Sequence, residues 1–292
     1  MNLALALSAI SGCGWATNIV AVRWALLRKV DAGSPVAPLA GGAVALWVAA
    51  FVPFLIAVLS GATLPAGNDI WRFAVVGLIA PGSSQGLFVA AINAIGSSRS
   101  SVLVSTNPMW SVLLAMVFLG EDWRLAVLVG TVLIVVGGAM TSWERGIGFR
   151  EIGALLALAT AFTFGLRDVV ARHFNSESDI SIWWAAALVL GIGALVASLI
   201  SWAKLRSSIR REFRNALPQF VPSGIAIGVA LTALFAALDI EEIGIVAPLV
   251  NAVQSVVVVA LGAIVFGAHE RSNRILVAIT LVILGGALIT SV

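Results

Sequence analysis

The chain has 292 residues, of which 60% are hydrophobic and only 11% are charged, with a formal net charge of +3. A soluble domain is nearer half apolar and a quarter charged, so this composition excludes a water-soluble enzyme and a disordered chain. The single cysteine, Cys13, excludes an internal disulfide, and two histidines are too few for a structural metal site. The composition therefore predicts a membrane protein that holds no metal and no cofactor.

Long apolar runs follow one another along the whole chain. A helix that crosses a bilayer needs about 20 mostly apolar residues, and ten such runs are joined by short connections. We therefore predict an all-α integral membrane protein with ten transmembrane helices. The first run lacks a basic flank and a cleavage site, so we expect a span and not a removable signal. The predicted spans are 3–23, 37–59, 71–93, 99–118, 125–142, 152–172, 181–202, 218–238, 244–266 and 275–291.

The second half of the chain repeats the first at an offset of about 148 residues. The aligned pairs are 14–23 with 163–172, 87–88 with 234–235, 95–96 with 243–244, Glu121 with Glu270, and 137–139 with 285–287. Apolar helices also align by chance, but matches that keep their order and register favour a repeat. We predict two five-helix repeats, 1–143 and 144–292. Because five is odd, the second repeat enters from the opposite side, and such inverted repeats are typical of secondary transporters.

Several small motifs within these repeats resemble those of a known family. They are Trp15-Ala16, Pro108, Gly120-Glu121 and Gly137-Gly138. As a set they resemble the drug/metabolite transporter superfamily, EamA type, over essentially the whole chain, and within it the ten-helix amino-acid exporters of the YddG and RhtA kind. The resemblance implies a multi-pass protein of the cell (inner or plasma) membrane with a central pathway between helices 3, 4, 8 and 9.

The chain departs from the family pattern in its second half. Val257 stands opposite Pro108, and the proline of that span comes earlier, at Pro248. The second half also has His269-Glu270 in place of Gly-Glu. The two repeats are therefore not expected to bend in the same way.

Polar side chains inside the spans must find partners within the protein or face a solute pathway. The run Pro-Gly-Ser-Ser-Gln-Gly at 81–86 predicts a kink, although Gly82 and Gly86 could equally serve close helix packing. Asn107 and Trp110 share a face of one span, and a polar stripe with two amides lies on span 244–266. Such amides suit a zwitterionic or polar solute, or else hydrogen bonds between helices.

These patterns, with deep aromatic residues that could stack on an apolar substrate, define the candidate site. The candidate substrate-binding residues are Trp15, Asn18, Ser83, Ser84, Gln85, Phe88, Asn107, Trp110, Phe164, Arg167, Asn251, Gln254 and Ser255. The candidate hinges are Pro81, Gly82, Pro108 and Pro248.

Two charges lie within a predicted span, Arg167 and Asp168. Adjacent helical residues point about 100° apart, so we expect Asp168 to pair with Arg172, four residues later. Arg167 is then left for backbone carbonyls or a substrate carboxylate. Acidic residues that precede the predicted fifth and tenth helices, Glu121 among them, are expected to cap those helices.

Two motifs favour other functions and fail on context. Residues 82–86 match the Gly-x-Ser-x-Gly pattern of serine hydrolases, but the pattern needs a strand-to-helix elbow and a histidine within reach. The basic run 204–214 could suggest nucleic acid, but beside a membrane anionic lipid headgroups are the simpler partner. We therefore expect a transporter that is not an enzyme and binds no nucleic acid.

The basic residues are unequally divided between the two membrane sides. The connections after odd-numbered spans hold Arg28, Lys29, Arg99, Arg145, Arg150, Lys204, Arg206, Arg210, Arg211, Arg214, Arg271 and Arg274. Those after even-numbered spans hold Arg72, Arg124 and Arg172. The positive-inside rule then puts both termini outside, whereas the family resemblance implies cytoplasmic termini. We favour the orientation that the loop charges predict, with both termini outside.

The main hypothesis is a monomeric secondary transporter that exports amino acids, aromatic or other hydrophobic ones among them, and related small metabolites by alternating access. A transporter or exchanger of a sugar phosphate or nucleotide sugar is the first alternative. A membrane receptor or scaffold, and an intramembrane serine protease, are the others.

Overall fold

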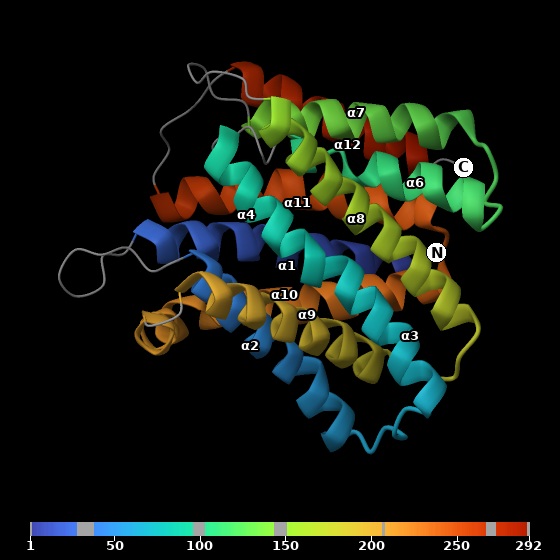
Figure 1. The fold of residues 1–292 in the computed structure, drawn as a ribbon. Coiled ribbons are helices and arrows are strands. Elements are labelled where there is room, and N and C mark those ends of the chain that lie inside the picture. Colours follow the sequence, from blue (N-terminus) through green and yellow to red (C-terminus); the bar gives the residue numbers. More distant parts are fainter. Residues whose placement is uncertain are drawn as a thin grey trace.

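Helices run back and forth through a single bundle in the computed structural model of the protein (Figure 1). The structure describes residues 2–27, 38–95, 103–142, 151–205, 208–266 and 273–290, and every regular element in those ranges is helical. The elements are α1 (Asn2–Leu27), α2 (Pro38–Leu59), α3 (Gly67–Gly77), the π-helical turn η2 (Leu78–Ser83), α4 (Ser84–Ile95), α6 (Asn107–Phe118), α7 (Leu125–Ser142), α8 (Glu151–Ser176), α9 (Ile182–Leu205), α10 (Ile209–Ile240), α11 (Ile243–Phe266) and α12 (Asn273–Thr290).

Six of the described helices are long and apolar enough to cross a membrane, namely α1, α2, α8, α9, α10 and α11. Shorter apolar helices lie within α6, α7 and α12, and the predicted span 71–93 is divided among α3, η2 and α4. An all-helical membrane architecture is therefore confirmed. The count of ten spans stays a prediction, although each of the ten predicted ranges contains helix.

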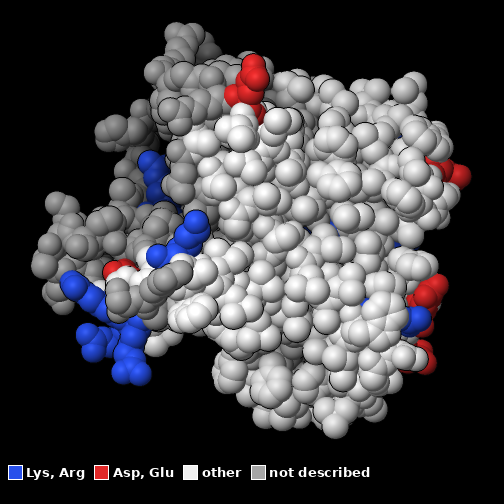
Figure 2. All heavy atoms as spheres, viewed as in Figure 1, with Lys and Arg blue, Asp and Glu red and all other residues white. Residues whose placement is uncertain are grey.

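The surface between the helix ends is apolar, as a bilayer requires. Leu59, Leu199 and Ile264 are among the large hydrophobic side chains that stay more than half exposed. In the view of Figure 2 the charged side chains gather toward the two ends of the helices, and the surface between them is almost uncharged. An outward-facing apolar band of this kind is favourable in lipid and unfavourable in water.

The two halves of the chain are interleaved. α1 packs mainly against α10 and α11, while its counterpart in the second half, α8, packs mainly against α4 and α6. The pairs α2 with α9 and α7 with α12 also join the halves. The packing pattern is thus nearly unchanged when the halves are exchanged, as expected for a repeat. The largest interfaces lie between the repeats, so neither repeat is a separate body.

The predicted kink lies at the start of residues 81–86. Ala80 has φ −155° and ψ 132°, outside the helical region, and Pro81 follows it within η2. Pro81 packs into a groove at Gly193 of α9, where a Cβ would lie 2.3 Å from its ring. In the second repeat Gly228 occupies the position that aligns with Pro81, and α10 is continuous there. The kink therefore belongs to one repeat only.

The other two candidate hinges lie in different settings. A turn at 105–106 interrupts the predicted span 99–118, and Pro108 follows in the first turn of α6, where proline is tolerated. Pro248 is buried within α11, and the helix continues through it.

Backbone contact between α2 and α10 gives a test of this packing. A Cβ on Gly224 would lie 2.6 Å from the carbonyl oxygen of Ala45, whereas a Cβ on Gly191 of α9 would meet nothing within 4 Å. We expect Gly224→Ala to lower the free energy of unfolding by about 1–3 kcal/mol, since overpacking forces the helices apart. Gly191→Ala is the matched control and should not destabilise the protein. Thermal unfolding in detergent, followed by tryptophan fluorescence, checks both, and equal effects would contradict the packing.

Candidate functional site

A buried ion pair lies at the middle of α8. Arg167 is 4% exposed and Asp168 is 2% exposed. Nε and Nη2 of Arg167 donate to Oδ1 of Asp168 at 2.9 and 2.6 Å, and the hydroxyl of Ser111 on α6 donates to Oδ2 at 3.0 Å. The two charges thus cancel within one helix, and Ser111 ties them to the first repeat.

The expected pairing of Asp168 with Arg172 is wrong. Arg172 instead turns to the end of α10, where Nη1 donates to the carbonyl oxygens of Leu238 (2.6 Å) and Glu241. The long arginine side chain of Arg167 curls sideways to its neighbour, so the angle between adjacent Cβ atoms does not prevent the contact. In a low-dielectric interior an unpaired carboxylate is strongly unfavourable, which favours the closest available cation.

Aromatic side chains lie on and beside the helix segment that carries the pair. The guanidinium of Arg167 lies 5.3 Å from the centroid of the Phe164 ring, within the range of a cation–π interaction. Gly165 lets α6 approach, because a Cβ there would lie 2.9 Å from Cβ of Trp110. Trp110 packs edge-on against Phe162 at 5.5 Å, and its indole nitrogen is buried without an acceptor in the described structure.

Ser111 connects the pair to a further predicted residue. Its hydroxyl lies 3.2 Å from Oδ1 of Asn107, one turn earlier on α6. Ser111 is fully buried and was not among the predicted site residues. Its spacing of four from Asn107 is the signal that could have found it. Asn107, Trp110, Phe164 and Arg167 are therefore brought together, and we call them, with Ser111 and Asp168, the central cluster.

The remaining predicted residues lie in separate groups. On α11, Asn251 donates to the carbonyl oxygen of Ser105 at 3.2 Å and accepts from Ser255 at 3.5 Å, so it holds the turn before α6. Gln254 is half-buried on the same helix. Asn18 on α1 accepts from Ser223 of α10 at 2.7 Å.

The two serines at the kink are satisfied locally. Ser83 donates to the carbonyl oxygen of Ile79 at 2.5 Å, and buried Ser84 donates to that of Pro81 at 3.3 Å. Gln85 lies against Gly42 of α2. Ser84 thus lies within a kinked helix and not on a strand-to-helix elbow, which removes the context that a hydrolase nucleophile needs.

The two remaining aromatic candidates, Trp15 and Phe88, take no part in these polar contacts. Trp15 is partly buried against the main hydrophobic core, and Phe88 is half-buried on α4. No hydrogen bond among the described residues joins the kink, Asn18 or Asn251 to the central cluster. In the same ranges no three His, Cys, Asp or Glu side chains gather as metal ligands would.

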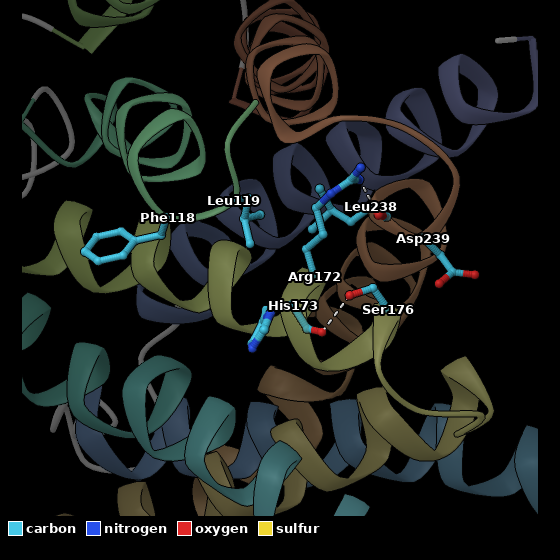
Figure 3. A pocket seen from close by; sticks show the side chains of 7 residues that line it. All are labelled: Phe118, Leu119, Arg172, His173, Ser176, Leu238 and Asp239. Atoms are coloured by element: carbon cyan, nitrogen blue, oxygen red, sulfur yellow. Dashed lines mark hydrogen bonds between the residues drawn. The ribbon is translucent and has the colours of Figure 1, made fainter. Parts of the chain in front are cut away.

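A cavity of about 340 Å³ opens at the end of the bundle where α1 begins and α12 ends, which we call the terminal face. Figure 3 shows its lining residues, which come from α6 and its end, α8 and α10: Phe118, Leu119, Arg172, His173, Ser176, Leu238 and Asp239. Arg172 lies one helical turn beyond the central cluster along α8.

Comparison with known families decides the class of the protein. The sequence model of the EamA-like transporter family matches residues 2–143 and again residues 151–292. The chain belongs to the EamA-like transporter family. It is therefore a multi-pass membrane protein of a family whose members are transporters.

Individual relatives are distant. A protein of Streptantibioticus cattleyicolor named a probable terminal-alkyne amino-acid exporter is 28% identical over 181 residues, or 60% of this chain and 59% of that protein. A protein of Bacillus cereus named as a sugar uptake protein is 26% identical over 182 residues, 58% of this chain and 60% of that protein. The matches thus span about three-fifths of each relative's length. A crystal structure with 17% identity aligns at a TM-score of 0.77 over 99% of this chain and 97% of that one, which shows a shared fold.

The ion pair gives a thermodynamic prediction. Asp168→Leu and Arg167→Met should each destabilise the protein by about 3–5 kcal/mol, because each leaves one buried charge without its partner. The double variant should recover most of that loss, since no charge is then left. Unfolding midpoints in detergent measure all three, and a double variant as unstable as the sum of the single ones would contradict the pairing.

Proposed function

We propose that the chain is a monomeric, ten-helix secondary transporter of the cell membrane, built from inverted repeats 1–143 and 144–292, that exports amino acids by alternating access. Its proposed substrates are aromatic and other hydrophobic amino acids in particular, together with related small metabolites. The observation that carries the proposal is the self-neutralised pair of Arg167 and Asp168 within the central cluster.

An amino-acid zwitterion is the chemical complement of this pair. Its carboxylate can take the place of Asp168 on the guanidinium of Arg167, while its ammonium group takes the place of Arg167 on Asp168. Both ionic contacts are exchanged and no net charge is added to the interior, which matters because a buried unpaired charge is costly. Ser111 and Asn107 can accept or donate further hydrogen bonds to the bound solute.

The aromatic wall supports a preference for apolar side chains. Phe164 lies beside the pair, and Trp110 packs against Gly165 of the same helix and edge-on to Phe162. Rings stack favourably on aromatic and aliphatic groups in a dry pocket. The relative named an amino-acid exporter supports the same substrate class.

Sugar transport is the second candidate. The relative named as a sugar uptake protein and the amides of Asn107 and Asn251 favour it. A sugar phosphate or nucleotide sugar fits less well, because it brings several negative charges and Arg167 is already neutralised by Asp168. An uncharged sugar would leave the ion pair closed throughout the cycle.

The ion pair also favours export down a gradient over proton exchange. Asp168 is the one acid at the middle of a helix in the described ranges, and Arg167 holds its carboxylate. We therefore propose facilitated export without a coupled proton. Since the repeats are interleaved, the motion consists of bending at breaks such as the kink at Pro81 and the turn before Pro108.

Flux in proteoliposomes tests the substrate class. We expect labelled phenylalanine and leucine to cross faster than glucose or a sugar phosphate, with a rate that does not respond to an imposed pH gradient. Arg167→Lys should lower this flux about tenfold or more, because lysine keeps the charge and loses the forked contact. Glu177→Gln on the terminal face is the matched control and should leave it unchanged. Sugar flux without amino-acid flux would contradict the proposal of amino-acid export, and no flux of any solute would favour a receptor.

The charge distribution predicts the orientation. Four basic side chains are exposed at the end opposite the terminal face, namely Lys204, Arg210, Arg211 and Arg214. The terminal face carries acids such as Glu177 and Asp239, and its arginines Arg72, Arg124 and Arg172 each form an ion pair with an acid. The positive-inside rule then places the terminal face outside the cell. A phosphatase fused to the C-terminus should be active and a fluorescent protein fused there dark, and the reverse result would give cytoplasmic termini.

A further inference from the structure

Glu121 holds a helix other than the one that follows it. Gly120 has φ +70°, a conformation that favours glycine, and turns the chain at the end of α6. The carboxylate of Glu121 then accepts from the backbone N–H groups of Ile243 (2.8 Å) and Gly244 (2.9 Å) at the start of α11. Glu121 therefore caps α11, not α7 as its position in the sequence suggests. The corresponding Glu270 lies outside the described residues.

Arg172 links this cap to two further helices. Its Nε lies 3.6 Å from Oε1 of Glu121, and its Nη1 donates to the two carbonyl oxygens at the end of α10. Arg124 adds a contact to Glu242 at 3.6 Å. We call Glu121 and Arg172 the latch, because they join the connection after α6 to α8, α10 and α11 at the terminal face.

The latch borders a cavity and holds the ends of two helices that pack against α1. Arg172 lines the terminal-face cavity of about 340 Å³ (Figure 3). α1 begins at the same face and packs against α10 and α11, the two helices whose ends the latch holds. Ser8 and Ser11 lie in this half of α1 and are 1% and 0% exposed.

The hydroxyls of Ser8 and Ser11 have no hydrogen-bond partner among the described residues. Other hydroxyls within the helices do find such a partner, since Thr131, Thr160 and Thr232 each donate to the carbonyl oxygen four residues earlier. A buried hydroxyl without a partner is unfavourable. Ser8 and Ser11 are spaced three apart and share a face with Trp15, four residues further. A polar face that is unsatisfied in one state is expected where another state supplies water or solute.

We propose that Ser8 and Ser11 line the terminal-side half of the solute path, and that the Glu121–Arg172 latch closes it in this structure. The inference rests on the proposed alternating access. Opening requires Glu121 to release the amides of α11 and Arg172 to release the end of α10. The cavity then becomes continuous with the face that carries both hydroxyls, and a zwitterionic solute reaches them from the central cluster.

Thiol labelling tests the latch without any substrate. In a Cys13→Ser background, Ser11→Cys reports on the path and Ala49→Cys, also 0% exposed but on α2, reports on general loosening. A charged methanethiosulfonate reagent is added to the terminal face of the full chain in proteoliposomes. Glu121→Gln removes the charge and one of the two acceptors, and Arg172→Lys shortens the reach to α10. Either variant should raise the labelling rate at position 11 about tenfold, the effect of losing one charged hydrogen bond.

Controls separate the outcomes. Glu177→Gln, an ion-pair partner of Arg72 on the same face, should leave labelling at position 11 unchanged. Labelling that rises equally at positions 11 and 49 indicates a loosened protein and overturns the proposal. So does a rate at position 11 that neither latch variant changes. Faster labelling at position 11 in a protein that transports no amino acid would support the latch and contradict the proposed substrate. Amino-acid flux without faster labelling in the latch variants would contradict only the latch.

Discussion

The hydrocarbon interior of a bilayer offers no partner for a hydrogen bond or a charge, and this constraint governs how most polar side chains within the described helices are paired. Most intramembrane hydroxyls donate to a carbonyl of their own helix, as Thr131 and Thr232 do. Asn18 and Asn251 find partners on neighbouring helices. Arg167 and Asp168 neutralise each other. The residues that depart from this pattern are therefore the informative ones, since each retains a hydrogen-bonding capacity that no described residue uses.

Interleaving of the repeats changes how transport can occur. Because α1 lies against α10 and α11, and α8 against α4 and α6, the repeats cannot separate as two rigid bodies. Several interfaces are also tight at the backbone, with Gly224 and Gly228 of α10 against α2. Helices held in this way move most easily where they are already broken. The irregular backbone at Ala80 and the turn at 105–106 both lie in the first repeat, so the bending that we propose is assigned to that repeat.

Sequence reasoning located the helices and the kink because apolar run length and proline act locally. It also selected Asn107, Trp110, Phe164 and Arg167 by residue type and helical spacing, and the structure brings these four together, while their role in binding stays a prediction. It was wrong about Arg172 and about the helix that Glu121 caps. In both cases the partner lies on a helix distant in the chain, and the choice depends on how the repeats interleave. Ser8 and Ser11 were missed for a related reason, because a serine in an apolar helix is ordinary until its surroundings are known.

The two repeats differ at positions where we propose that the solute binds. Trp15 and Asn18 of α1 align with Phe164 and Arg167 of α8. The first aligned pair is aromatic in both repeats, whereas the second is a neutral amide in one repeat and a charged guanidinium in the other. A strictly symmetric transporter would present the same face to the solute in both orientations. Here α8 carries the ion pair of Arg167 and Asp168, whereas α1 carries the hydroxyls of Ser8 and Ser11 and the amide of Asn18. In the cycle that we propose, a zwitterion is held by charge at the centre and by weaker neutral groups toward the terminal face, and this difference favours release on the terminal side once the latch opens.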